Sequence, residues 1–318
     1  MANARLLEHK VAVVTGASRG IGKAIALELA DLGASVVVTA RTDAPRSDIA
    51  GTIGETARDL EALGVPTLTV KADLLNPADL LALSERTVAV FGRVDILVNN
   101  AAYIGDEVFQ SFWEMSSEAW QAQFDLNVNV QFRLMKAFAP LMRERGGGLI
   151  VNLGSNDGNV PVGDLPLPRQ GGLGAAYPTT KAAIVHMTRW IGNELRAADI
   201  TAVCLGPGYA RSESAELLSS KMGLDVSLAQ PWRSRPRWWA VSQPVRTRCN
   251  TPGLSSRPPT WPQSRGSCRP GLPRASAGCT SVEVDHRTLR WPLRVRAHRG
   301  GVGRSAGHRS ASPPGTDR

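Results

Sequence analysis

Residues 11–22, VAVVTGASRGIG, decide the fold of this chain. Residues 11–15 form a short apolar run that predicts a buried strand, and residues 21–32 have helical spacing. The glycines between them let the backbone turn tightly and approach an anion. The N-terminus of the following helix offers unpaired N–H groups to a phosphate. The order of strand, glycine-rich turn and helix therefore predicts a dinucleotide-binding loop, with an ordinary turn as the alternative.

The same alternation of strand and helix continues through the first 225 residues. The apolar runs lack polar alternation, which is typical of strands covered on both faces. Predicted strands are 11–15, 35–40, 67–70, 94–98, 149–153 and 200–204, and predicted helices are 21–32, 51–63, 77–91, 118–145 and 177–196. This order predicts an α/β fold with a doubly wound, Rossmann-like parallel sheet of six strands.

Residues 226–318 have a different composition. They hold 17 of the 37 basic residues, all of them arginine, but only three of the 28 acidic residues. The net charge of +9 therefore hides an acidic part, residues 1–225, with 20 basic and 25 acidic residues. That balance excludes a basic nucleic-acid-binding domain for residues 1–225 and makes nucleic acid an unexpected partner.

We predict two regions, a folded domain over 1–225 and a disordered Arg/Pro/Ser-rich tail over 226–318. The tail has no Ile, Lys, Phe, Tyr or Met and no helical or strand periodicity. Two interpretations stay open. The tail is either a basic segment that binds an anion or a partner, or the product of a frameshift in a GC-rich gene.

Other classes of protein are excluded by the absence of their sequence signals. No run of 18 apolar residues predicts a membrane span, and Glu8, His9 and Lys10 stand where a signal peptide is apolar. Only Cys204 of the four cysteines lies in residues 1–225, and no cysteine has metal-ligand spacing with histidine. We expect a reducing, cytoplasmic compartment, no membrane partner and no metal site.

Six motifs then occur in an order that resembles the short-chain dehydrogenase/reductase family, over about residues 8–222. They are Thr15-Gly-x-x-x-Gly-x-Gly22, Asn99-Asn100-Ala101, Asn127, Ser155, Tyr177-x-x-x-Lys181 and Pro207-Gly208. The resemblance implies an oxidoreductase that transfers a hydride between a nicotinamide cofactor and a carbonyl or secondary alcohol. A catalytically impaired nucleotide-binding remnant, or an anion-binding adaptor that works through the tail, are the alternatives.

The predicted catalytic residues are Asn127, Ser155, Tyr177 and Lys181. Tyr177 and Lys181 are four residues apart, so on a helix they share one face. A nearby ammonium lowers the pKa of a phenol, which is otherwise near 10. The resemblance implies that Tyr177 transfers the proton, that Lys181 also binds the nicotinamide ribose and that Asn127 holds a water. Ser155 is placed to hydrogen-bond the substrate oxygen.

The sequence departs from the family pattern around Tyr177. Pro178 follows it directly and predicts a helix that begins at Tyr177 itself, because proline is tolerated only in the first turn. The stretch between Ser155 and Tyr177 is also longer than is usual in the family, which predicts a longer loop over the substrate pocket.

The resemblance implies a set of cofactor-binding residues. They are Thr15, Gly16, Ser18, Arg19, Gly20, Ile21, Gly22, Arg41, Asp73, Asn99, Ala101, Tyr177, Lys181, Pro207, Gly208 and Ser212. An acidic residue at the end of the second strand would select NAD(H), but Ala40 and Arg41 stand there. Together with Arg19 they favour a 2′-phosphate, so we predict NADP(H), with NAD(H) as the alternative.

The family usually adds a seventh strand after Pro207-Gly208, and the tail has no pattern for one. We therefore expect six strands, with the sixth at an exposed edge. A homo-oligomer is usual in the family, but this C-terminal region argues against it here.

Overall fold

The computed structural model describes residues 5–44, 49–155, 172–208, 210–213, 215–217 and 230–231. All of them belong to the first of two units, Met1–Cys249, and none to the second, Asn250–Arg318. The predicted boundary after residue 225, the predicted disorder of the tail and most of the long loop before Tyr177 lie outside the described residues.

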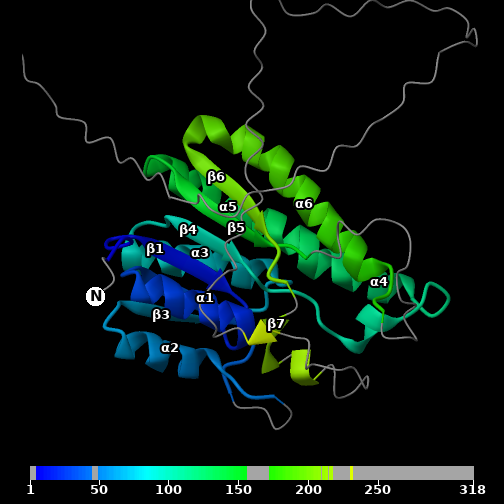
Figure 1. The fold of residues 1–318 in the computed structure, drawn as a ribbon. Helices are drawn as coiled ribbons and strands as arrows, with labels where there is room; N and C mark the ends of the chain where they lie inside the picture. Colours follow the sequence, from blue (N-terminus) through cyan, green and yellow to red (C-terminus); the bar gives the residue numbers. More distant parts are fainter. Residues whose placement is uncertain are drawn as a thin grey trace, which may run out of the picture. The chain divides into compact units, whose positions relative to one another are not determined.

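A parallel sheet of six strands organises the first unit, as predicted (Figure 1). Its strand order is β3-β2-β1-β4-β5-β6. The strands are β1 (Val11–Thr15), β2 (Ser35–Ala40), β3 (Thr67–Lys71), β4 (Ile96–Asn99), β5 (Gly148–Leu153) and β6 (Ile200–Leu205). The chain leaves β1 in one direction to build β2 and β3, and then returns to β1 to add β4. In open α/β sheets ligands bind at such a reversal, which here lies beyond the carboxyl ends of β1 and β4.

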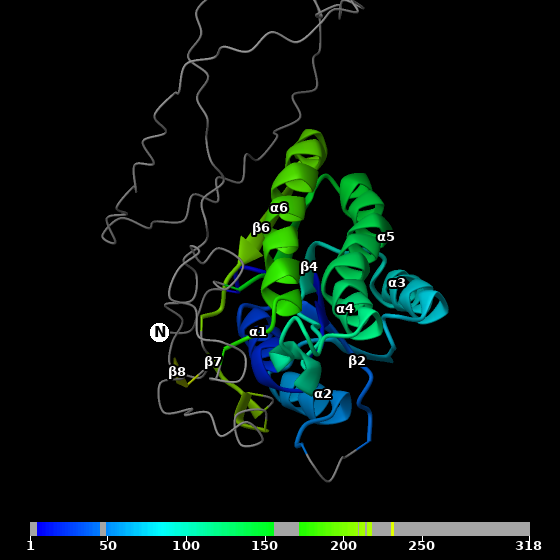
Figure 2. The ribbon, with the colours of Figure 1, turned by 90° about the vertical axis from the view of Figure 1, so that its right-hand side faces the viewer.

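Helices cover the sheet from both sides. They are α1 (Gly20–Asp31), α2 (Ile53–Ala62), α3 (Pro77–Phe91), α4 (Ser117–Phe124), α5 (Val130–Glu144) and α6 (Ala176–Leu195). Side chains of α1 and α2 share one core with alternate residues of the strands, and side chains of α3, α5 and α6 share the other. Figure 2 shows α6, α5 and α3 side by side. Because both faces of the central strands are covered, β1, β2 and β4 are mostly apolar, as the sequence indicated.

Local sequence sets the helix ends. Thr52 begins α2 with a capping box, in which its hydroxyl accepts a hydrogen bond from the amide of Glu55 and the carboxylate of Glu55 accepts one from the amide of Thr52. Asn76 caps α3 ahead of a proline at its first turn, and Gly92 ends that helix in a left-handed conformation, with φ of 67°.

Two of the predicted helices differ from the structure. The helix expected over 118–145 is divided into α4 and α5 by one π-helical turn, η2 (Asp125–Asn129), which places Asn127. The helix expected to begin at Tyr177 begins one residue earlier, at Ala176, so Pro178 still lies in the first turn, where proline is tolerated. Two short 3₁₀ segments, η1 (Asp106–Phe109) and η5 (Arg196–Ala198), were not predicted.

The β6 end of the sheet is less covered than its centre. Within the described residues no further strand pairs with β6 in this sheet. On the face that α1 and α2 cover elsewhere, Leu149 of β5 and Val203 of β6 are only partly buried. Two-residue strands β7 (Ala210–Arg211) and β8 (Gln230–Pro231) pair with each other in a separate small sheet. The six-stranded sheet predicted from the sequence is therefore confirmed.

Candidate active site

The glycine-rich loop after β1 is held against the end of β4 by a set of hydrogen bonds. The buried Thr15 hydroxyl donates to the carbonyl of Val98 and accepts from the amides of Asn100 (3.0 Å) and Ala101 (3.1 Å). The side-chain amide of Asn100 donates in turn to the carbonyls of Thr15 (2.8 Å) and Gly16 (3.1 Å). Thr15 and Asn100 thus set the shape of the loop, a role that the sequence analysis did not assign to Asn100.

Two glycines of this loop are required by close packing. Gly16 has φ of 63°, and a Cβ there would lie 3.0 Å from the Cα of Ala101. A Cβ on Gly22 would collide with the carbonyl oxygen of Gly16 and the side-chain nitrogen of Asn100. These two positions exclude larger residues for a reason internal to the protein, whatever ligand the loop binds.

The N-terminus of α1 presents backbone donors at this loop. Arg19 is the N-cap residue and makes no side-chain cap hydrogen bond. The amide of Gly20 donates to the carboxylate of Glu213 at 2.9 Å, whereas the amides of Ile21 and Gly22 have no hydrogen-bond partner among the described residues. An anion is stabilised at such an end by the helix dipole and by the N–H groups.

The guanidinium of Arg19 lies against the loop before α2. Its Nε donates to the carbonyl of Ala50 at 2.8 Å and one Nη donates to the carbonyl of Gly51 at 2.6 Å. The hydroxyl of Thr56 adds a hydrogen bond to the carbonyl of Ala17. Arg19 therefore joins two loops, a role that the sequence analysis missed because it treated Arg19 only as a partner for phosphate.

The neighbouring strand ends place two further predicted residues. Arg41 follows β2 and is exposed, and Asp73 follows β3, where its carboxylate accepts a hydrogen bond from the amide of Leu75. Because β2 and β3 are adjacent and parallel, both residues lie at the same edge of the sheet as the glycine-rich loop. Their placement agrees with an adenosine-binding region on this side of the reversal point.

Asn99, the last residue of β4, points into the protein. Its side chain is 1% exposed and donates to Asn152 of β5 at 2.7 Å. Asn152 donates to the hydroxyl of Thr188 on α6 at 2.8 Å. This buried chain of polar groups joins β4, β5 and α6, so the side chain of Asn99 supports the framework beneath the site. Its predicted contact with the cofactor stays a prediction.

Tyr177 and Lys181 lie on consecutive turns of α6, as their spacing predicts. Lys181 is 2% exposed, and its Nζ donates to the carbonyl of Leu153, the last residue of β5, at 2.9 Å. The same Nζ is 5.4 Å from the centroid of the Tyr177 ring. A buried ammonium is thus tethered to the end of β5 and held beside a partly exposed phenol, with Ser155 two residues beyond that strand.

Asn127 lies in the π-helical turn and is fully buried. Its side-chain oxygen accepts a hydrogen bond from the amide of Tyr103 at 2.7 Å, and its nitrogen donates to the hydroxyl of Thr180 at 3.0 Å. Thr180 donates to the carbonyl of Tyr177 at 2.7 Å. Asn127 therefore supports the first turn of α6 and the segment after β4. The water that we expect it to hold stays a prediction, as does the catalytic role of each of the four residues.

The segment after β6 reaches the glycine-rich loop. Gly208 has φ of 71°, which lets the chain turn after Pro207. Ser212 then lies beside Gly20, since a Cβ on Gly20 would be 3.2 Å from the Cβ of Ser212. The structure thus brings Ser212 of this segment to the loop after β1.

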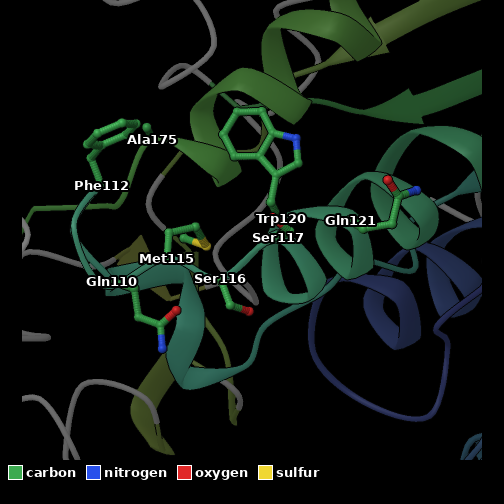
Figure 3. Close-up of a pocket in the computed structure, with 8 residues that line it drawn as sticks. All are labelled: Gln110, Phe112, Met115, Ser116, Ser117, Trp120, Gln121 and Ala175. Atoms are coloured by element: carbon green, nitrogen blue, oxygen red, sulfur yellow. The ribbon is translucent and has the colours of Figure 1, made fainter.

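A shallow pocket lies next to the start of α6. Its walls come from the loop before α4, from α4 itself and from the residue before Ala176 (Figure 3). The lining residues are Gln110, Phe112, Met115, Ser116, Ser117, Trp120, Gln121 and Ala175. None of them is charged. A longer loop over the substrate pocket was expected from the sequence, and none of these lining residues was assigned to the site.

Within the part of the chain that the structure describes, no three His, Cys, Asp or Glu side chains gather as metal ligands would. The helices of that part also include none that is long and apolar enough to cross a bilayer.

Comparison with known proteins agrees with this arrangement. The sequence pattern of the short chain dehydrogenase family matches residues 10–223. A short-chain type dehydrogenase/reductase of Picea abies is 35% identical over 202 residues, which are 64% of this chain and 71% of that protein. A 3-oxoacyl-[acyl-carrier-protein] reductase of a Synechocystis species is 33% identical over 215 residues, 68% of this chain and 80% of that protein.

A solved structure is similar as well. L-sorbose reductase of Gluconobacter frateurii, crystallised with NADPH and L-sorbose, superposes with a TM-score of 0.57 at 33% identity and covers 67% of this chain and 73% of its own. The family pattern, over residues 10–223, spans the sheet, the glycine-rich loop and the Tyr177–Lys181 helix. This chain belongs to the short-chain dehydrogenase/reductase family, whose members are NAD(P)-dependent oxidoreductases.

Proposed function

We propose that this chain transfers a hydride between a nicotinamide cofactor and the carbonyl or secondary alcohol carbon of a small molecule, with Tyr177 exchanging the proton on oxygen. The observation that carries the proposal is the buried ammonium of Lys181, tethered to the carbonyl of Leu153 and 5.4 Å from the Tyr177 ring. A cation in this place favours the phenolate over the neutral phenol.

The residues around the glycine-rich loop fit a dinucleotide. The amides of Ile21 and Gly22 offer unused donors at the N-terminus of α1, and Arg41 and Asp73 flank the loop at the ends of the next two strands. Lys181, Tyr177 and Ser212 would hold the other end of the molecule. When bound, the nicotinamide ring supplies or accepts the hydride.

Side chains of the protein would transfer the proton to and from the substrate oxygen. In the direction of reduction, the Tyr177 hydroxyl gives its proton to the substrate oxygen, and in oxidation the phenolate takes it back. Ser155, beyond the end of β5, would donate a hydrogen bond to the same oxygen and fix its position. Lys181 would stabilise the phenolate form of Tyr177, because burial holds its ammonium beside the ring.

The uncharged pocket at Phe112, Met115 and Trp120 suggests where the rest of the substrate lies. Ala175, which lines this pocket, is two residues before Tyr177. Aromatic and thioether side chains favour an apolar or planar group, and the adjacent serine and glutamine side chains supply hydrogen bonds. We therefore propose that a neutral part of the substrate enters here.

For the cofactor we propose NADP(H). Ala40 at the end of β2 brings no carboxylate to repel a 2′-phosphate, and the exposed Arg41 beside it supplies a positive charge. Arg19 contributes less than the sequence suggested, since its guanidinium donates to two backbone carbonyls. The NADPH bound to the similar L-sorbose reductase supports this choice without deciding it.

Tyr177→Phe tests the chemistry. The variant keeps the ring but loses the ionisable oxygen, so turnover should fall by about 10³-fold while cofactor affinity changes little. Tyr103→Phe removes a phenol that is hydrogen-bonded to Glu107 and should cost less than tenfold. Equal turnover in the Tyr177 variant and the wild type would show that the proton comes from elsewhere. Cofactor binding without any wild-type turnover would favour an impaired remnant.

Arg41→Asp tests the cofactor choice. We expect the Kd for NADPH to rise about tenfold or more, because one charge contact to phosphate is lost and a repulsive one is gained. The Kd for NADH should stay within about threefold. Titration of both cofactors by fluorescence measures the ratio, and a wild type that already binds NADH more tightly would contradict the proposal.

A further inference from the structure

The segment after β6 brings a carboxylate to the phosphate-binding end of α1. Oε2 of Glu213 accepts a hydrogen bond from the amide of Gly20 at 2.9 Å, across 193 positions of sequence. Gly20 is the first residue of α1 and has φ of 56°. A carboxylate at this place has the same attraction to the helix dipole and N–H groups as a phosphate would have.

The position of Glu213 is set by its own turn of helix. The hydroxyl of Ser212 accepts a hydrogen bond from the amide of Ala215 at 3.2 Å, and its carbonyl accepts one from the amide of Glu216 at 2.8 Å. Ser212 thus acts as an N-cap, and Glu213 is the first residue of the turn. The contact between Ser212 and the Gly20 position brings this turn against the loop.

The pyrophosphate of the cofactor and the carboxylate of Glu213 would occupy the same site at the N-terminus of α1. A pyrophosphate held at the N-terminus of α1 would lie next to the Glu213 carboxylate, and two anions at one helix end repel each other. The remaining donors are the amides of Ile21 and Gly22. They belong to the same turn of α1 as Gly20 and therefore offer no separate binding site for the pyrophosphate.

We propose that Glu213 is a built-in competitor for the cofactor's phosphate site. In the free protein its carboxylate accepts a hydrogen bond from the amide of Gly20 and so holds Glu213 against the glycine-rich loop. When a pyrophosphate binds, the carboxylate leaves this amide and the Glu213 side chain turns away from the helix end. This inference rests on the proposed function, because it assumes that the loop binds a dinucleotide.

Glu213→Gln and Glu213→Ala test the competition, with Glu216→Gln as the matched control. Glu216 is an exposed acid on the same turn. Removing the charge at position 213 should tighten NADPH and ADP binding by about fivefold, the size of a single charge at a helix end. Binding of adenosine, which has no phosphate, should not change, and the control should bind all three ligands as the wild type does.

The contact itself is tested by amide hydrogen exchange. In the free wild type the Gly20 amide should exchange slowly, and both inorganic pyrophosphate and Glu213→Ala should change its rate, whereas Glu216→Gln should not. Unchanged or weaker ADP binding in both Glu213 variants, or an unchanged Gly20 exchange rate in Glu213→Ala, would overturn the proposal while leaving the proposed function intact. If neither the wild type nor the Glu213 variants bind nucleotide or pyrophosphate, the proposed function is overturned, and the competition with it.

Discussion

Two parts of the sheet, β1–β2 and β5–β6, differ in how they are covered and in what they contribute to the site. Around β1 and β2 both faces are buried, and Val36 and Val37 are fully inaccessible on opposite sides. At β6 side chains on both faces are only partly buried, among them Ala202 on the α6 side and Val203 on the opposite side. The β1–β2 part supplies the predicted cofactor loop. The β5–β6 part supplies Ser155 and supports Lys181 and Tyr177.

The glycine-rich loop and the predicted catalytic residues are also held in place by different kinds of hydrogen bond. The glycine-rich loop is shaped by hydrogen bonds with backbone groups, through Thr15 and Asn100. The predicted catalytic residues on α6 are supported by buried side chains that link distant elements, such as Asn127 with Thr180 and Asn152 with Thr188. Both groups of residues therefore depend on contacts between separate elements: the loop on hydrogen bonds to backbone groups where β1 and β4 end, and Tyr177 and Lys181 on buried side chains that join η2, α6 and the sheet.

Replacing one valine by aspartate in each of these two parts of the sheet, on the same face, tests the difference in coverage most directly. Val36→Asp puts a carboxylate into the fully buried face under α1 and α2, and should lower the free energy of unfolding by about 4 kcal/mol or more. Val203→Asp lies on the same face but is partly exposed, and should cost about 1–2 kcal/mol. Urea denaturation measures both, and equal losses would show that β6 is as well covered as β2.

A pair of glycine substitutions would sharpen the account of the loop. Gly22→Ala forces a Cβ against the Gly16 carbonyl and the Asn100 side chain, and should cost about 2–3 kcal/mol and weaken cofactor binding. Gly54→Ala is the control, because its Cβ would meet only the Thr52 hydroxyl, at 3.9 Å. It should leave binding unchanged and stabilise α2 by about 0.5 kcal/mol. A neutral Gly22→Ala would mean that the loop can relax.

The smallest expected effect concerns Asp95, at the opposite end of β4 from the site. Burial raises its pKa, but hydrogen bonds from Arg93, the Val11 amide and Lys10 outweigh this and hold the pKa of the carboxyl below its usual value. Because the folded-state pKa is the lower one, its stabilisation is present above about pH 4 and is lost as the pH falls through the folded-state pKa.

Asp95→Asn should therefore lower stability at pH 7, and the difference from the wild type should shrink as the pH falls from 5 towards 2. Denaturation at several pH values measures this difference, and turnover at pH 7 should not change. A gap in stability that is independent of pH would mean that the charge of Asp95 contributes nothing.

The sequence alone predicted the sheet and the places of the motifs, because both depend on local patterns. Runs such as 11–15 and 35–40 are mostly apolar and lack polar alternation, and the spacing of Tyr177 and Lys181 sets a common helix face. It did not predict the π-helical turn at Asn127, because the hydrogen bonds of its side chain run to Tyr103 and Thr180, elsewhere in the chain.

What the sequence by itself determined is thus the architecture, the family motifs and their order along the chain. Only the tertiary structure decided that Arg19 binds the Ala50 and Gly51 carbonyls, that Asn99 is buried against Asn152, and that Glu213 reaches the amide of Gly20. Each of these contacts joins residues more than 30 positions apart. Periodicity and motif spacing describe neighbours along one element, whereas such contacts arise only when separate elements pack together.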